Sequence, residues 1–116
     1  MLIYIVDDNL DMCEFISFVL SDEGYRVRAC HCPMQALAEM KDKQLQPTVL
    51  ITDYNMPKMN GYELHQQVIA FAPELKTVVI SGRCVQGLIG ELPFLQKPFP
   101  PERLHKLIQT VTSSIE

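Results

Sequence analysis

The sequence predicts an α/β fold in which helices cover both faces of a parallel β-sheet. Short apolar runs alternate along the 116 residues with segments whose apolar side chains recur at helical spacing. The runs are nearly continuous in apolar character, which is typical of strands that are buried on both faces. Strands that alternate with helices are joined by right-handed crossovers, so the sheet is expected to be parallel.

The first strand and the first helix are predicted by the first 24 residues. Residues 2–6 form a continuous apolar run, which predicts the first strand. Asn9 can cap the following helix, Asp11 suits the positive end of its dipole, and Gly24 fits just past its C-terminus. The apolar side chains expected on this helix are Met12, Phe15, Ile16, Val19 and Leu20.

The second strand and helix lead to a third strand. Residues 25–30 mix polar and apolar side chains, as expected for a strand near a sheet edge. Pro33 can occupy the first turn of the second helix, and Pro47 ends the connection to a third strand at 48–52. The side chains expected to mark the second helix are Met34, Leu37 and Ala38.

The second half of the chain continues the alternation. A loop with Pro57 and Gly61 precedes the third helix, which must stop near Pro73, and residues 77–80 form the fourth strand. The last helix enters at Pro100–Pro101. The apolar markers are Leu64, Val68 and Phe71 on the third helix and Leu104, Leu107, Ile108 and Val111 on the last.

The segment between the fourth and last strands is short for a helix. Residues 82–92 carry glycines at three positions, and a proline follows at 93. A glycine inside a helix costs about 1 kcal/mol relative to alanine. A fifth strand around Phe94 and Leu95 must fit before the last helix. We therefore expect the fourth helix to be shortened or absent.

The composition is that of an ordinary globular domain. The chain is 47% hydrophobic and 21% charged, and its length suits one domain over residues 1–116. A formal net charge of −4 with scattered Lys and Arg argues against direct nucleic-acid binding. Cys30-His31-Cys32 lacks the spacing and the second ligand pair of a structural zinc site. No signal segment or membrane span is recognised, so we expect a cytoplasmic location with reduced thiols and no membrane partner.

Polar side chains follow the strands where a ligand site is expected. Five parallel strands suit the doubly wound, flavodoxin-like order 2-1-3-4-5, in which ligands bind beyond the carboxyl ends of the strands. Asp7 and Asp8 end the first strand, and Asp53 follows the third. Ser81 follows the fourth strand and Lys97 the fifth. These side chains are expected to converge.

Three converging carboxylates need a cation. Without one they repel each other, and at least one would have a raised pKa. Hard oxygen ligands with room for water suit Mg²⁺, which takes one or two carboxylates together with a phosphate. Ser81 can donate a hydrogen bond to a phosphoryl oxygen, and Lys97 supplies a compact positive charge.

The combination of motifs resembles one known family over nearly the whole chain. The sequence is similar to the receiver domains of bacterial two-component response regulators, which are CheY-like. The stretches that carry this resemblance are Val6-Asp7-Asp8, Asp53-Tyr54-Asn55-Met56-Pro57 with Gly61, Ser81-Gly82, and Lys97-Pro98-Phe99.

The resemblance implies roles for five of these residues in phosphoryl chemistry. Asp53 is implied to be the phosphoacceptor. Asp8 and Asp53 would bind Mg²⁺ directly, together with the main-chain carbonyl of Asn55. Asp7 would act on the metal mainly through water, and Lys97 would contact the phosphoryl group.

The resemblance also implies a conformational switch. Ser81 would take the switch hydroxyl position and Phe94 that of the switch aromatic, and the Lys97–Pro98 bond would be cis. The family often uses the face of the fourth helix, fifth strand and fifth helix for output. Because residues 82–92 are too short for a full helix, we hypothesise output through another face or through a loop that phosphorylation orders.

The implied function is a phosphorylation-dependent signalling switch. A histidine kinase or histidine phosphotransfer protein would donate the phosphoryl group, and a downstream protein or fused effector domain would read the result. The domain would be no enzyme beyond catalysing its own phosphorylation and dephosphorylation.

Two other functions compete with the switch. A constitutive, phosphorylation-independent interaction module is favoured by the short segment after Ser81, but it leaves the complete site without a purpose. A phosphatase with an aspartyl nucleophile, in the haloacid dehalogenase style, would place that nucleophile after the first strand and a second Asp two residues on. Asp53 follows the third strand, and Asn55 occupies that second position.

Overall fold

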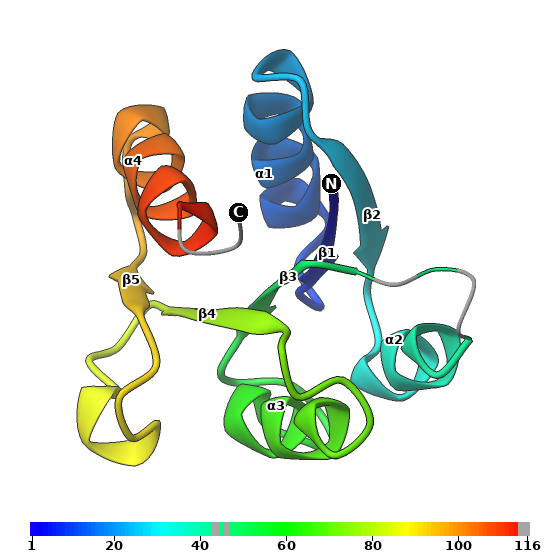
Figure 1. The fold of residues 1–116 in the computed structure, drawn as a ribbon. Helices are drawn as coiled ribbons and strands as arrows, with labels where there is room; N and C mark the ends of the chain where they lie inside the picture. The colour runs from blue at the N-terminus through cyan, green and yellow to red at the C-terminus, as the bar shows by residue number, and fades with distance from the viewer. Residues whose placement is uncertain (43–44, 46, 114–116) are drawn as a thin grey trace.

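The computed structural model describes residues 1–42, 45 and 47–113, so the last three positions of the predicted domain lie outside it. All neighbouring strands pair in parallel in the order β2-β1-β3-β4-β5, which confirms the doubly wound fold (Figure 1). The strands are β1 (Leu2–Val6), β2 (Arg26–Cys30), β3 (Val49–Asp53), β4 (Lys76–Ser81) and β5 (Phe94–Gln96).

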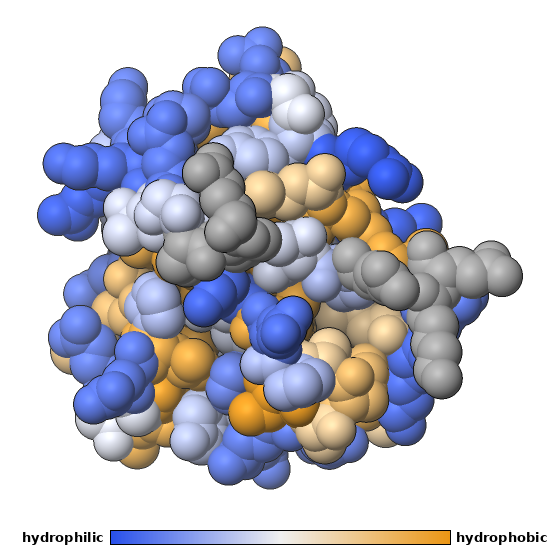
Figure 2. Space-filling model, viewed as in Figure 1, coloured by the Kyte–Doolittle hydropathy of each residue, from blue (hydrophilic) through white to orange (hydrophobic). Residues whose placement is uncertain are grey.

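Helices pack on both faces of the sheet, two on each (Figure 1). One core cluster joins α1 and α4 to the side chains of one face, including Ile3 and Ile51. The other joins α2 and α3 to the opposite face, including Tyr4 and Leu50. Hydrophilic side chains gather over the outer side of α4 (Figure 2). The helices are α1 (Leu10–Asp22), α2 (Pro33–Met40), α3 (Gly61–Ile69) and α4 (Pro101–Thr112).

The second helix carries the three predicted marker residues, but they do not share its buried face. Met34 is 47% exposed and Ala38 is also exposed, whereas Leu37 is buried as expected. Pro33 starts the helix and is itself buried. The buried positions then recur three and four residues on, at Pro33, Ala36, Leu37 and Met40.

The predicted end of the third helix needs a similar correction. Phe71 lies beyond α3, which ends at Ile69, and its side chain is 39% exposed. The residues that anchor this helix to the sheet are Leu64 and Val68. In the part of the chain that the structure describes, no helix is both long enough and apolar enough to cross a membrane.

No α-helix forms between β4 and β5, where the glycines of residues 82–92 predict a shortened or absent helix. One 3-10 turn, Gln86–Leu88, stands between β4 and β5. Val85 and Ile89 flank this turn, and both are buried against Val79 of β4. The hypothesis of a loop that phosphorylation orders must therefore accommodate a segment that already holds two buried anchors.

A polar cluster ties α2 to the first two strands. Arg28 donates two hydrogen bonds to the Glu39 carboxylate, at 2.9 and 2.8 Å, and the Tyr4 hydroxyl donates a third at 2.8 Å. The Arg28 hydrogen bonds, with that of Tyr4, lower the pKa of Glu39 to about 2 although partial burial acts in the opposite direction. The cluster therefore favours the ionised carboxylate.

Substitution Glu39→Gln is expected to lower the free energy of unfolding by about 1 kcal/mol at pH 7. Arg28 is half exposed, so water screens the pair and keeps the effect small. Because the pKa of Glu39 is lower in the folded than in the unfolded chain, this stabilisation is present above pH 4.5 and is lost as the pH falls towards 2. Urea unfolding at pH 7 and pH 2.5 measures it, with Glu14→Gln on α1 as control. An equal loss at both pH values would contradict the assignment.

Gly61 lets α3 begin directly against β3. Its amide donates a 2.9 Å hydrogen bond to the carbonyl of Tyr54, and a Cβ at this position would collide with the main-chain oxygen of Asp53. A Cβ at Gly87 would meet nothing within 4 Å. Gly61 therefore fixes how closely the helix approaches the end of β3.

Substitution Gly61→Ala is expected to cost about 2 kcal/mol of unfolding free energy, because main-chain atoms must move to admit the methyl group. Gly87→Ala is the matched control and is expected to stay within about 0.5 kcal/mol of the parent. Chemical denaturation of the three proteins provides the comparison. Equal stability of the two variants would show that the contact with Asp53 imposes no constraint.

Candidate functional site

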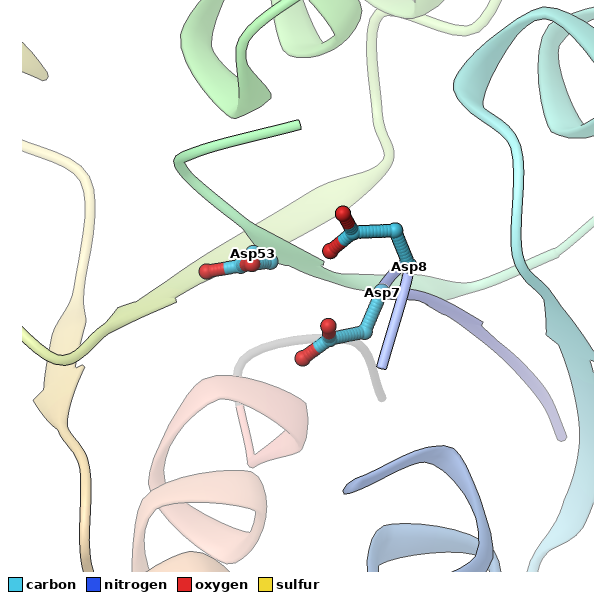
Figure 3. A group of neighbouring side chains, drawn as sticks. All are labelled: Asp7, Asp8 and Asp53. Carbon is cyan, nitrogen blue, oxygen red and sulfur yellow. The ribbon is translucent and has the colours of Figure 1, made fainter. Parts of the chain in front are cut away.

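Three carboxylates meet at the carboxyl edge of the sheet. Ligand oxygens of Asp7, Asp8 and Asp53 all lie within 4.8 Å of one another, and Figure 3 shows the side chains projecting to the same side. The strand register explains this, because Val6 of β1 pairs with Thr52 of β3. The next residue of each strand is therefore an aspartate at the same level of the sheet.

Lys97 brings a positive charge to this cluster from the far edge of the sheet. Its ammonium group lies 2.9 Å from Oδ2 of Asp7 and 3.4 Å from Oδ1 of Asp53. The Lys97 amide donates a 2.8 Å hydrogen bond to the carbonyl of Ser81, which fixes the main chain just after β5. The Lys97–Pro98 bond that follows is cis.

The two carboxylates nearest Lys97 differ in their surroundings. Asp7 is fully buried, and both its oxygens are engaged, Oδ1 by the Asn9 amide at 2.9 Å and Oδ2 by Lys97. Asp53 is almost fully buried, and its pKa is raised to about 6 by this burial and by the charge of Asp7, against the opposing effect of Lys97. The positive charge of Lys97 alone therefore does not offset the effects of burial and of the Asp7 charge on Asp53.

The surrounding carboxylates stabilise the protonated form of Lys97. Burial alone would lower the pKa of its ammonium group, but the hydrogen bond to Asp7 and the charges of Asp7 and Asp53 raise it. The ammonium group therefore stays protonated while it faces the carboxylates.

The donor set fits a hard divalent cation. Asp8 is exposed and Asp53 keeps oxygens directed to the same space, so both can serve as ligands, whereas Asp7 has less capacity left. Carboxylate oxygens with access to water are the ligands that Mg²⁺ prefers. Cys30 and Cys32 are free thiols, one buried and one exposed, and no described residue joins them in a metal-binding group.

Ser81 and Asn55 are linked through a residue that the sequence analysis missed. Ser81 is fully buried, and its Oγ accepts a 3.1 Å hydrogen bond from the Arg83 amide. The Arg83 guanidinium donates a 3.0 Å hydrogen bond to Oδ1 of Asn55. An arginine two positions after a strand carries no sequence signal, so this contact emerged from the fold alone.

Phe94 belongs to the small core under the 3-10 turn. It is partly buried and packs with Val79, Val85 and Ile89. Tyr54, the residue after Asp53, packs against the same cluster. The Phe94 side chain is thus connected to the site through Tyr54, which packs in the same cluster. Its role in a switch stays a prediction.

Comparison with known proteins agrees with this geometry. Residues 3–109 match the family model described as the response regulator receiver domain. The chain is 28% identical to the chemotaxis protein CheY of Thermotoga maritima, over 95% of this chain and 96% of that protein. It is 32% identical to a two-component response regulator of Arabidopsis thaliana, ARR21, over 97% of this chain but only 19% of that protein.

Solved structures give the same result. The chemotaxis protein CheY4 of Vibrio cholerae superposes with a TM-score of 0.85 at 28% identity, over 95% of this chain and 97% of that chain. A response regulator receiver protein from Sinorhizobium medicae reaches a TM-score of 0.90 at 20% identity, over 100% and 97%, and supports the fold. The family match covers most of the sequence, and so the chain belongs to the response regulator receiver domain family.

Proposed function

We propose that this receiver domain is a phosphorylation switch in which Asp53 accepts a phosphoryl group from a histidine kinase or a histidine phosphotransfer protein. The observation that carries the proposal is the pair of contacts from Lys97 to Asp7 and Asp53, beside an acidic group that fits a divalent cation. Mg²⁺ would be held by Asp8, Asp53 and the main-chain carbonyl of Asn55, with Asp7 acting through water.

The proposed transfer is a direct displacement at phosphorus. A carboxylate oxygen of Asp53 forms a new P–O bond while the P–N bond of the donor phosphohistidine breaks, and the imidazole nitrogen keeps that electron pair and takes up a proton. When bound, Mg²⁺ supplies positive charge to the phosphoryl oxygens. The role of Lys97 is to hold its ammonium group at Asp53, where negative charge gathers during transfer.

The proposed switch needs more than one new contact. Moving a two-state equilibrium from mostly off to mostly on takes roughly 5 kcal/mol of differential stabilisation. A hydrogen bond from Ser81 to a charged phosphoryl oxygen contributes about 1.5–3 kcal/mol. The remainder is assigned to Lys97 and to repacking of Phe94 in its small core. A downstream protein or a fused effector domain would read the repacked surface.

A constitutive interaction module is the second candidate. The observation that favours it is the replacement of a helix by the turn at Gln86–Leu88, which alters the surface next to β5. Such a module would keep the fold and bind its partner equally well with and without phosphorylation.

A phosphoryl adduct on Asp53 is the expected result of incubation with Mg²⁺ and a small acyl phosphate. Intact-mass measurement should show one adduct on the parent protein and none on Asp53→Asn, because the amide is a far weaker nucleophile than the carboxylate. Asp11→Asn, on the exposed side of α1, is the control and should be modified like the parent. No adduct on the parent, with Mg²⁺ binding demonstrated, would favour the constitutive module.

Mg²⁺ is expected to stabilise the folded protein. At a concentration about ten times its Kd, a ligand of the folded state adds about 1.4 kcal/mol to the free energy of unfolding. Asp53→Asn removes one ligand and should gain less. In a chelator, however, this variant should be about 2 kcal/mol more stable than the parent, because it removes a buried charge that Asp7 repels. Thermal unfolding with and without Mg²⁺ measures both effects, and an equal Mg²⁺ gain in the two proteins would argue against the assigned ligand set.

A further inference from the structure

We propose that Arg83 is a second cationic contact for the phosphoryl group, which Asn55 holds beside the site until that group arrives. The inference rests on the proposed function of Asp53. Its structural basis is the 3.0 Å hydrogen bond from the Arg83 guanidinium to Oδ1 of Asn55. This bond joins the loop after β4 to the loop after β3, and those loops flank Asp53.

The main chain of Arg83 is fixed from the other side. Its amide donates to Oγ of Ser81 at 3.1 Å, and Ser81 is the fully buried last residue of β4. Asn55 is two residues beyond Asp53 and exposed, as is Arg83 itself. The guanidinium is therefore held beside Asn55, two residues beyond Asp53, and at the surface.

The charge balance of the site calls for another cation. Lys97 is the cation that the structure places on Asp7 and Asp53, and it is already divided between them. A phosphoryl group carries about −1.5 to −2 charges near neutral pH. With Asp7, Asp8 and the phosphoryl group set against one lysine and one divalent ion, about one negative charge stays uncompensated. One arginine would balance it.

The resting partner of Arg83 is suited to release it. Asn55 offers a neutral oxygen at the surface, and such a hydrogen bond adds little stability because water competes for both groups. A phosphoryl group offers charged oxygens that match the planar fork of a guanidinium. The guanidinium would thus exchange a weak partner for a strong one when Asp53 is phosphorylated.

The exchange also reaches the switch hydroxyl. The Arg83 amide donates to Oγ of Ser81, so the residue whose guanidinium would bind the phosphoryl group also contacts the switch hydroxyl through its main chain. Arg83 would then help to bind the anion and would link that binding to Ser81.

The test compares anion binding with metal binding in single variants. Arg83→Gln removes the charge, and Arg83→Lys keeps the charge without the planar fork. Arg26→Gln is the matched control, because Arg26 is exposed on β2 and pairs with Leu2 at the opposite end of the strands. Calorimetry gives the Kd of beryllofluoride, a phosphoryl mimic, in saturating Mg²⁺, and the Kd of Mg²⁺ alone. The rate of adduct formation is followed against acyl phosphate concentration.

Arg83→Gln is expected to weaken the binding of beryllofluoride without weakening that of Mg²⁺. The Kd of beryllofluoride should rise about tenfold, the value of one charge-assisted hydrogen bond at a partly exposed site. The Kd of Mg²⁺ should stay the same or fall up to about threefold, because a repelling charge is removed. The acyl phosphate concentration for half-maximal rate should rise with little change in the maximal rate. Arg83→Lys should lie between Arg83→Gln and the parent, and Arg26→Gln should match the parent.

Three results would overturn the proposal. Equal beryllofluoride affinity in Arg83→Gln and Arg26→Gln would show that Arg83 does not contact the anion. Loss of affinity for both beryllofluoride and Mg²⁺ would show a structural role only. If the parent protein itself bound no beryllofluoride and formed no adduct, the proposed function would fail, and this inference with it.

Discussion

The ammonium group of Lys97 between Asp7 and Asp53 is the interaction on which this molecule depends. Asp7 is fully buried, and a buried carboxylate without a cation costs several kcal/mol. The cation comes from the residue after β5 and the carboxylates from the carboxyl ends of β1 and β3, so these contacts join three strands of the sheet. The charges of the site are therefore brought together only when the strands have this order.

This arrangement leaves the site with too much negative charge for its own stability. Asp53 keeps a raised pKa in spite of Lys97, because burial and Asp7 outweigh the lysine. Replacing a whole buried ion pair with apolar side chains of similar volume is often neutral or stabilising, so folding alone does not require these charges. A buried carboxylate with a raised pKa beside a specific charged partner is an arrangement that clusters at functional sites.

The strands and the site could be predicted because their signals are local. Apolar runs located the strands, and parallel pairing then required Asp7, Asp8 and Asp53 to meet at one edge. The glycines after Ser81 likewise predicted the loss of a helix. The buried side of α2 could not be read from its pattern, because apolar Met34 and Ala38 face solvent while Pro33, Ala36, Leu37 and Met40 are buried by tertiary packing. Arg83 was missed because its contact with Asn55 joins two loops that are distant in sequence.

The loss of the helix before β5 has a consequence for local stability. β5 has three residues that pair with β4 alone, and the segment leading into it is fastened by Val85 and Ile89. Regions with few buried contacts open at a lower free energy than the rest of a protein. This edge is therefore where the sheet is expected to open first, and opening would carry Lys97 away from Asp7. Opening of β5 would therefore also change the charge balance of the acidic group, so the two changes would occur together.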